Sequence, residues 1–229
     1  MKILFVCNEF PPAIHGGIGS FVYSMAHELV RHNWKCFVAG FDTSISATTT
    51  RVEDGIHVTR IRSPYSKYPG IHFGKYSLNL NFLLDRIYLS GQVKNLILRE
   101  KILLVESFDS SGPLWSKPPA ILIVRMHGAI SAYQYYQRKS MSKLLWPLEH
   151  KNVKMADQLV AVSHHIGELT LLALHLRKKE FRVIYNGVNT DCFKPKGVRD
   201  NKTILYAGTV NRRKGTIELF KAFNMIGSK

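Results

Sequence analysis

The stretch AILIVRM at residues 120–126 is apolar at every position except Arg125 and is the most informative run in the chain. A strand this rich in Ile and Val is covered on both faces, which is typical of a parallel sheet sandwiched between helices. The run KILFVC at residues 2–7 has the same character and predicts a second buried strand. The two runs together predict an α/β fold built on an inner parallel sheet.

Segments of helical period separate further apolar runs along the chain. In residues 18–32 the apolar side chains recur at the spacing of one helix face, namely Ile18, Phe21, Val22, Met25 and Leu29. Residues 53–55, Glu-Asp-Gly, predict a hairpin turn between strands at 50–52 and 56–61. The remaining strands are expected at 35–40, 102–106, 158–162 and 181–185, and the remaining helices at 78–100, 139–156 and 164–178. This alternation predicts a doubly wound, Rossmann-like domain.

A change in composition near residue 195 predicts a domain boundary. Residues 186–201 contain Gly187, Pro195, Gly197 and several charges, a composition typical of a connecting segment. Beyond it, a strand is expected at 203–207 and a helix at 215–226. One such βα unit cannot bury its own apolar faces, so it predicts only the start of a second Rossmann-like domain. The assignments are 1–195 for the first domain, 196–202 for the linker and 203–229 for the incomplete second domain.

The composition limits the class of protein. The chain has 229 residues, of which 45% are hydrophobic, and this length suits roughly one and a half domains of about 150 residues. Three well separated cysteines, Cys7, Cys36 and Cys192, exclude a disulfide scaffold and a CxxC metal knuckle and favour a reducing compartment. The amino-terminal apolar run is shorter than the roughly 7–15 residues of a signal-peptide core, and no run approaches the roughly 18 residues of a membrane span. We therefore expect a cytoplasmic protein.

The segment NEFPPAIHGGIG at residues 8–19 lies between the first strand and the first helix, at the edge of the sheet where open α/β folds bind ligands. Gly16 and Gly17 allow backbone N–H groups to approach an anion, which the N-terminus of the following helix also attracts. The alternative is a loop whose glycines serve only for turning. A GxGxxG dinucleotide fingerprint starting at Gly17 would have Val22 where its third glycine is required. It would also begin too many residues after the first strand. Because Asp42 is placed to bind a ribose, an NAD-dependent oxidoreductase remains an alternative function.

Two other places carry residues suited to chemistry. His127 follows the strand at 120–126 and is expected to point into the same crevice, with a purely structural role as the equal alternative. Glu106 ends the preceding strand and has the same two interpretations. Residues 208–215, GTVNRRKG, place cations beside a helix N-terminus, which opposes the helix dipole unless an anion binds there. An exposed basic turn is the alternative for this segment.

The adjacent histidines His164 and His165 predict no metal site. They point apart on a helix, and Glu168 alone at i+4 is a poor partner for His164. Ser163 precedes them and is expected to cap that helix.

Three stretches together resemble glycosyltransferase family 4, whose members are retaining enzymes of the GT-B fold. The Pro-Pro and Gly-Gly loop at 11–17 resembles the opening of that family's amino-terminal domain. Val162-Ser163 followed by YNGVNTDCFKP at 185–195 resembles its interdomain signature, and residues 206–215 resemble the first βα unit of its donor domain. The order and spacing agree over essentially the whole chain.

The resemblance implies two Rossmann-like domains that face each other across a cleft, the first on the acceptor side and the second holding the donor. It implies transfer of a hexosyl group from a nucleotide-diphosphate sugar, with retention and without a metal cofactor, because cations and helix N-termini stabilise the leaving diphosphate. By position, it implies that Gly16, Gly17, Thr209, Arg213 and Lys214 contact the donor, that His127 is catalytic beside the transferred sugar, and that Glu9 and Glu106 lie on the acceptor side.

Two departures from the family pattern affect these expectations. Thr209 stands where an arginine paired with Lys214 is usual, so donor binding rests more heavily on Arg212 or Arg213, and Asn189 replaces a common aspartate. The family's paired glutamates near the donor sugar lie deep in the second domain, which has only begun by residue 229. We therefore expect this chain to be inactive or nearly so by itself.

The net charge of +16 predicts a polyanionic neighbour. With interleaved aromatic residues, it suits peripheral docking on the anionic inner face of a membrane and a lipid-linked or envelope glycan acceptor, as in polysaccharide biosynthesis. A solvated basic surface is the alternative. A non-catalytic nucleic-acid-binding module is disfavoured, since no helix-turn-helix, zinc-finger or RNP pattern is present. The basic residues of this surface are Arg60, Arg62, Lys67, Lys75, Arg138, Lys139, Lys143, Lys151, Lys154, Arg177, Lys178, Lys179 and Arg182.

Overall fold

The computed structural model describes residues 1–12, 16–65, 77–191, 193–194, 197, 203–210 and 214–227. The chain divides into two compact units, unit 1 at Met1–Asn189 and unit 2 at Thr190–Lys229, and each is described by itself. This division falls between Asn189 and Thr190, within the segment of connecting composition at 186–201 and before the predicted linker at 196–202.

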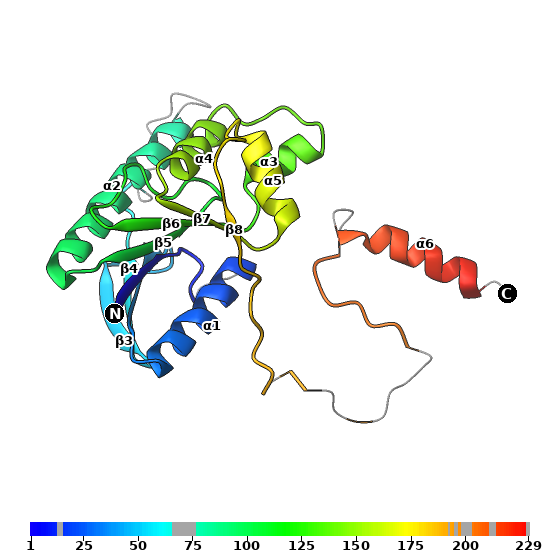
Figure 1. The fold of residues 1–229 in the computed structure, drawn as a ribbon, viewed down its shortest axis with the longest axis horizontal. Helices are drawn as coiled ribbons and strands as arrows, with labels where there is room; N and C mark the ends of the chain where they lie inside the picture. The colour runs from blue at the N-terminus through cyan, green and yellow to red at the C-terminus, as the bar shows by residue number, and fades with distance from the viewer. Residues whose placement is uncertain are drawn as a thin grey trace. The chain divides into compact units, whose positions relative to one another are not determined.

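Unit 1 is a single sheet with helices on its faces (Figure 1). Its strands are β1 Lys2–Val6, β2 Lys35–Phe41, β3 Thr49–Glu53, β4 Ile56–Ile61, β5 Leu104–Phe108, β6 Ile121–Met126, β7 Gln158–Ala161 and β8 Arg182–Val183. Its helices are α1 Gly17–Arg31, α2 Ser77–Glu100, α3 Ile130–Tyr136, α4 Leu145–Lys154 and α5 His164–Ala173.

The sheet confirms the predicted doubly wound, Rossmann-like fold. Its strand order is β3-β4-β2-β1-β5-β6-β7-β8, and every neighbouring pair is parallel except the hairpin of β3 and β4. The run β4-β2-β1-β5-β6-β7 follows the Rossmann order, in which the direction of winding reverses between the first and fourth strands. That reversal lies here between β1 and β5, and it places the crevice at their carboxyl ends.

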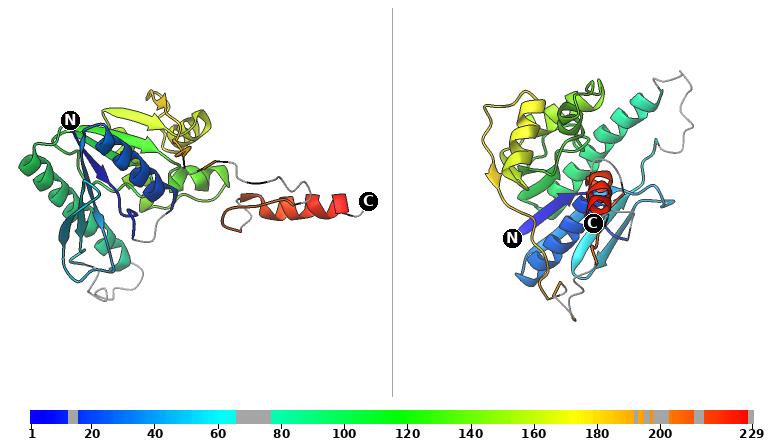
Figure 2. Two further views of the ribbon diagram at one scale, coloured as in Figure 1. Left: turned by 90° about the horizontal axis from the view of Figure 1, so that it is seen from below. Right: turned by 90° about the vertical axis from the view of Figure 1, so that its right-hand side faces the viewer.

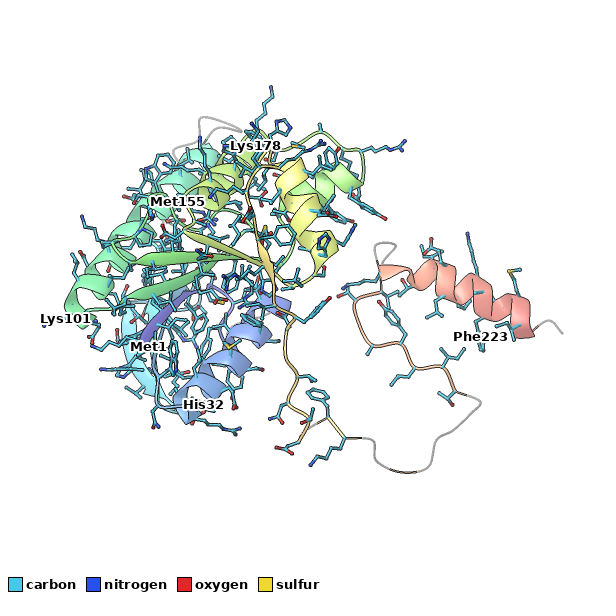
Figure 3. The ribbon with its side chains drawn as sticks, viewed as in Figure 1. Met1, His32, Lys101, Met155, Lys178 and Phe223 are labelled. Atoms are coloured by element: carbon cyan, nitrogen blue, oxygen red, sulfur yellow. The ribbon has the colours of Figure 1, made fainter. Side chains whose placement is uncertain are left out.

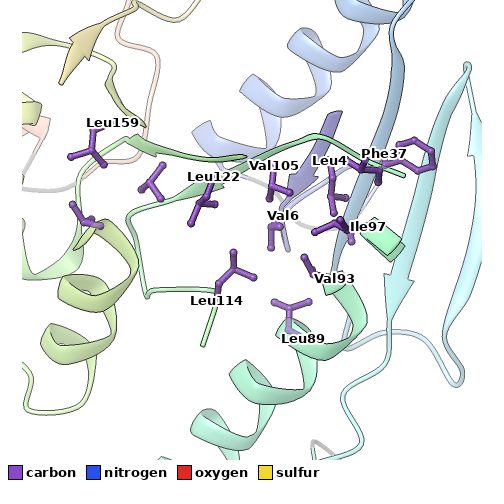
Figure 4. Close-up of a cluster of buried hydrophobic side chains, with 14 of the residues drawn as sticks. Leu4, Val6, Phe37, Leu89, Val93, Ile97, Val105, Leu114, Leu122 and Leu159 are labelled. Carbon is purple, nitrogen blue, oxygen red and sulfur yellow. The ribbon is translucent and has the colours of Figure 1, made fainter. Parts of the chain in front are cut away.

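Alternate residues of each inner strand face opposite layers of helices. On β1, Leu4 and Val6 pack in a buried cluster with residues of α2, α4 and α5 (Figure 4), whereas Ile3 and Phe5 pack with residues of α1. The two clusters explain the continuous apolar runs, because a strand covered on both faces exposes no side of itself to water. Figure 2 shows these layers from two further directions.

Several predicted elements of unit 1 have different bounds in the structure, among them the strand expected at 181–185, which is β8 at Arg182–Val183. The fifth strand begins at Leu104 instead of residue 102, because Lys101 turns with a φ of 53° and the amide of Ile102 bonds to the carbonyl of Ile97. The helix expected at 139–156 is the shorter α4, and α3, which was not predicted, precedes it across a turn with Arg138 at a φ of 54°. Helix α5 ends at Ala173 instead of 178, before His175 at a φ of 56°.

Unit 2 contributes residues 203–210 and the helix α6, Thr216–Gly227. The strand predicted at 203–207 does not form, and the prediction was wrong. A strand exists only where a neighbour pairs its N–H and C=O groups, and no strand of the described residues offers that pairing to unit 2. Apolar side chains of α6 are left at its surface, including Phe220 at 66% and Phe223 at 50% exposure (Figure 3).

Candidate functional site

Most of the predicted site residues of unit 1 lie on or just after β1, β5 and β6, on the side of the carboxyl ends of these strands. Open α/β sheets bind ligands at such a reversal of strand order. Phe21, on the second turn of α1, packs edge-on against His127 at the end of β6, with 5.3 Å between ring centroids. The first turns of α1 and the loop after β6 therefore border the same space.

Helix α1 begins at Gly17, and its N-cap residue is Gly16, which has no side chain to satisfy the first amides. The Glu9 carboxylate accepts a hydrogen bond from the Gly16 amide at 3.0 Å, so this amide already binds a negatively charged oxygen. A Cβ atom added at Gly17 would meet no described atom within 4 Å. Among the described residues, none occupies the space directly beside the Gly17 Cα.

The loop after β1 is fastened to its neighbours by two polar side chains. Asn8 accepts a hydrogen bond from the amide of Phe41 at 2.8 Å. Arg60 of β4 donates to the carbonyls of Phe10 and Pro11 and lies 3.6 Å from the Asp42 carboxylate. The basic residue Arg60, expected on a docking surface, is thus an internal anchor of the glycine loop.

Asp42, the candidate ribose ligand of an NAD enzyme, is engaged within the protein. Its carboxylate accepts hydrogen bonds from the Ser44 amide at 2.9 Å and the Ser44 hydroxyl at 2.6 Å. These bonds, helped by Arg60, lower the pKa of Asp42. The carboxylate therefore orders its own turn and meets Arg60, an arrangement that gives the dinucleotide interpretation no support.

His127 lies between two phenylalanine rings, Phe21 and Phe108, at centroid distances of 5.3 Å and 5.4 Å. Burial, with a smaller contribution from the charge of Arg125, lowers the pKa of His127 to about 4. The imidazole is therefore neutral near pH 7. Its Nε2 is buried and has no hydrogen-bond partner among the described residues. A neutral ring with one unsatisfied polar atom is suited to hydrogen-bond a ligand that enters the crevice.

Asp109, which follows β5, holds the backbone of the His127 loop in place. It is fully buried, and its carboxylate accepts hydrogen bonds from the amides of His127 at 3.0 Å and Gly128 at 3.1 Å. Burial raises the pKa of Asp109 to about 7, although these two hydrogen bonds oppose the shift. The loop that carries His127 is thus positioned by a buried carboxyl group whose pKa is unusually high for an aspartate.

Glu149 of α4 is a second fully buried acid beside the same loop. Its carboxylate accepts three backbone hydrogen bonds, from Ser111 at 2.8 Å and from Ile130 and Ser131 at 2.9 Å each. The latter two amides open helix α3 and lack partners within the helix, and a negative charge is favoured at this end of the helix dipole. Glu149 therefore replaces the N-cap side chain that Ala129 cannot supply.

Sequence reasoning missed both buried acids, although each left a signal. Asp109 directly follows a buried strand, which is the same criterion that selected His127. Glu149 lies between the buried Leu148 and Val153 on the inner face of α4. A carboxylate on an apolar helix face indicates a specific partner, because an unpaired buried charge is too costly to retain.

Glu106 and Arg125 form a buried ion pair under this crevice. Their side chains are 6% and 5% exposed, and Arg125 Nε donates to Glu106 Oε1 at 2.7 Å. Burial raises the pKa of Glu106, while Arg125 opposes the shift. The Arg125 guanidinium also lies 4.5 Å from the Phe21 ring. The carboxylate predicted to meet an acceptor is here bound to a neighbouring strand.

The predicted donor residues of the second domain belong to unit 2 or lie outside the described residues. Thr209 accepts a hydrogen bond from the Tyr206 hydroxyl through its carbonyl at 3.0 Å. Lys214 lies two residues before α6, and Arg213 lies outside the described residues, as does Arg212. Among the described residues, no group of three or more His, Cys, Asp and Glu side chains gathers as metal ligands would.

Ser163 caps α5 as predicted, accepting a hydrogen bond from the Ile166 amide at 3.2 Å. The imidazole of His164 faces Glu168 at 3.4 Å on the same helix. Within the described ranges, no helix has both the length and the apolarity that crossing a membrane requires.

Comparisons with known proteins identify relatives of this chain. A sequence model of the family described as Glycosyltransferase Family 4 matches residues 15–192. The catalytic domain of starch synthase IV from Arabidopsis thaliana, bound to ADP and acarbose, is similar in structure, with a TM-score of 0.53 and 12% identity. This match covers 83% of the chain and 52% of the synthase.

A second similar structure is trehalose-6-phosphate synthase from E. coli bound with UDP-2-fluoro glucose. Its TM-score is 0.50 and its identity 10%, over 83% of this chain and 50% of that one. The chain thus spans about half the length of these two glycosyltransferases of the GT-B fold. A search of curated protein sequences finds no significant match.

Proposed function

The chain belongs to glycosyltransferase family 4, and we propose that it forms the acceptor-side half of an enzyme that transfers a hexosyl group from a nucleotide-diphosphate sugar to a glycan or lipid-linked acceptor with retention. The nucleotides bound to its structural neighbours, ADP and UDP-2-fluoro glucose, make a nucleotide sugar the plausible donor. The geometry of the crevice supports this donor chemistry.

The observation that carries the proposal is the start of α1 at Gly16 and Gly17. The helix N-terminus offers a positive dipole end and amides that no described side chain caps to a diphosphate, and a Cβ at Gly17 meets no described atom within 4 Å. Glu9 already bonds to the Gly16 amide, as an anionic oxygen of a ligand would. In this proposal a diphosphate oxygen meets the amides after Gly16, and Glu9 turns toward the acceptor.

His127 provides a neutral hydrogen-bonding group beside the transferred sugar. Its lowered pKa prevents it from acting as a cation near pH 7, so it does not neutralise the diphosphate. Its buried Nε2 instead hydrogen-bonds a sugar hydroxyl, and the aromatic walls of Phe21 and Phe108 fix the ring. Asp109 and Glu149 hold the loop on which it stands.

Cations and backbone amides, rather than a metal, stabilise the leaving diphosphate in this mechanism. Lys214 and Arg213 supply positive charge from the second domain, and Thr209 contributes backbone contacts where the family has an arginine. Because the chain spans about half the length of its structural neighbours, we propose that residues 1–229 alone turn over far more slowly than about 1 s⁻¹. The site of action is the cytoplasmic face of a membrane that holds a lipid-linked or envelope glycan acceptor.

Chemical-shift titration tests the diphosphate site. Uridine diphosphate and inorganic pyrophosphate, added separately to ¹⁵N-labelled chain, are expected to shift the amides of Gly17, Ile18 and Gly19 and the ring of His127. The variant Gly17→Leu places a side chain at the start of α1, where a Cβ atom meets no described atom within 4 Å, so the ligand-induced shifts of this variant should vanish. Gly91→Leu in α2 is the matched control, since a Cβ atom there also meets no described atom within 4 Å.

The same titration separates the alternatives. If Gly17→Leu and the unaltered chain show equal chemical-shift changes with diphosphate, the diphosphate does not bind at the start of α1. Shifts that appear with NAD but not with either diphosphate would favour the oxidoreductase. Shifts confined to basic surfaces on addition of nucleic acid would favour a binding module.

A further inference from the structure

One exposed surface of unit 1 combines tyrosines with cations, and we call it the α3–α5 basic surface. It contains two neighbouring hollows of about 590 Å³ and 530 Å³, both lined by Tyr135. Helices α3 and α5 pack side by side beneath it (Figure 1). Its defining residues are Tyr135, Tyr136, Arg138, Lys139, Arg177 and Lys178.

No ion pair among the described residues involves the four cations of this surface. Arg138, Lys139, Arg177 and Lys178 are all exposed. Lys178 is labelled in Figure 3 at the edge of unit 1. Glu168 on α5 is exposed and faces His164, and Glu180, which follows Lys178 by two residues, is exposed as well.

Lys179 lies in the same stretch but has another role. Its ammonium donates to the carbonyls of Val153 at 3.3 Å, Lys154 at 2.7 Å and Ala156 at 3.1 Å, at the C-terminus of α4. A cation there satisfies carbonyls that the helix cannot. The predicted docking residue Lys179 is therefore structural, and the four cations around it are the ones free to face a partner.

The tyrosines are held beside these cations by the turn that ends α3. Tyr135 is 41% and Tyr136 67% exposed. The amide of Arg138 bonds to the carbonyl of Tyr135 at 3.0 Å, and that of Lys139 to the carbonyl of Gln134 at 2.9 Å. Rings with a polar tip, next to long basic side chains, are typical of surfaces that rest at the boundary between lipid headgroups and acyl chains.

We propose that the α3–α5 basic surface docks unit 1 on an anionic lipid bilayer. The proposal deepens the proposed function, since it rests on a membrane-bound acceptor, but docking itself requires no transfer. Each basic residue near an anionic leaflet strengthens partitioning by about fivefold. The four cations together therefore account for about 600-fold, and the tyrosines add apolar contact at the headgroup level.

Vesicle flotation of the full chain tests the surface. The chain should float with vesicles of phosphatidylcholine mixed with phosphatidylglycerol and remain behind with phosphatidylcholine alone. Binding should weaken as salt rises from about 0.1 M to about 1 M, because the Debye length falls from about 10 Å to about 3 Å. The variant Arg138→Gln, Lys139→Gln, Arg177→Gln and Lys178→Gln should partition about 600-fold more weakly.

The matched control removes the same charges elsewhere. The control variant neutralises four exposed cations on β3 and at α2 by combining Arg51→Gln, Lys94→Gln, Arg99→Gln and Lys101→Gln. Net charge is equal in the two variants, so a partition loss confined to the first assigns the effect to the surface. Tyr136→Ala should weaken binding further, whereas Tyr185→Ala, at an exposed tyrosine outside the surface, should not. Unchanged far-ultraviolet circular dichroism confirms that each variant is folded.

Three outcomes would overturn the proposal: equal flotation with both vesicle types, equal losses in the two fourfold variants, or preferential binding of single-stranded RNA that only the surface variant loses. None of them bears on the diphosphate titration at Gly17. Conversely, an absent response to diphosphate leaves vesicle binding as a separate result.

Discussion

Replacement of Glu149 tests whether one buried carboxylate organises the candidate site. The Glu149 side chain accepts hydrogen bonds from three backbone amides, those of Ser111, Ile130 and Ser131. A buried amide left without a partner costs about 1–3 kcal/mol. Glu149→Ala leaves all three without the carboxylate and should therefore destabilise unit 1 by about 3 kcal/mol or more.

The variant Glu149→Gln allows a finer measurement. Its amide oxygen can keep the two hydrogen bonds that Oε1 accepts, from Ser111 and Ile130. Its NH₂ group then faces the Ser131 amide, donor against donor, so one bond is lost. We expect a loss of about 1–3 kcal/mol in the free energy of unfolding. This is a large share of the about 5–15 kcal/mol that holds a typical domain together.

Urea unfolding, followed by tryptophan fluorescence and by far-ultraviolet circular dichroism, measures the change. Glu180→Gln is the matched control, because Glu180 is exposed and such substitutions usually stay within about 0.5 kcal/mol. Native-state hydrogen exchange of Glu149→Gln should show the amide of Ser131 losing protection first, because its bond to Oε2 is the one that is lost. If Glu149→Gln unfolds at the same urea concentration as Glu180→Gln, the carboxylate does not hold the loop.

Three further predictions concern pH and local order. The pKa of Asp109 is raised from 3.8 to about 7, so the carboxyl group binds a proton more tightly in the folded chain. Its contribution to the free energy of unfolding is therefore full below about pH 4 and is lost as the pH rises through 7. In Asp109→Asn this loss of stability with rising pH should be absent, and urea midpoints that fall equally between pH 4 and 8 in both proteins would contradict the prediction. The ring of His127 should stay neutral until about pH 4 in a nitrogen-15 NMR titration, and a midpoint near 6.5, the ordinary value, would show that the ring is hydrated. Amides of residues 203–207, which belong to no strand, should exchange far faster than those of Val105 and Leu122 on inner strands, and comparable protection would show that a partner strand covers them.

The sheet of unit 1 was predictable because its strands are buried on both faces. Apolar runs such as 120–126 are typical of strands in parallel sheets that helices cover on both faces, and the observed β6 begins one residue later. Local patterns also sufficed for α1, whose apolar face is read within fifteen residues, and for the Ser163 cap. In each case the determining contacts are near in sequence or depend on burial alone.

The failures share a dependence on remote partners. Helix α3 is seven residues long, and the carboxylate that caps it comes from Glu149 on another helix. The pattern of residues 203–207 favours a strand, but a strand needs a neighbour. At the site, the position of His127 directly after a strand was enough to select it as a candidate. The protonation state of its ring was not predictable, because the pKa is lowered by burial against Phe21 of α1 and Phe108 of β5.

Phe21 touches both the His127 ring and the Arg125 guanidinium, and Arg125 in turn donates to the carbonyl of Ile184 at 3.3 Å. Ile184 comes just after the last strand, a few residues before the chain leaves unit 1 at Asn189. Three contacts thus connect the His127 ring to the backbone of Ile184 within unit 1. A substitution at Phe21 therefore removes a neighbour from both the His127 ring and the guanidinium that fixes Ile184.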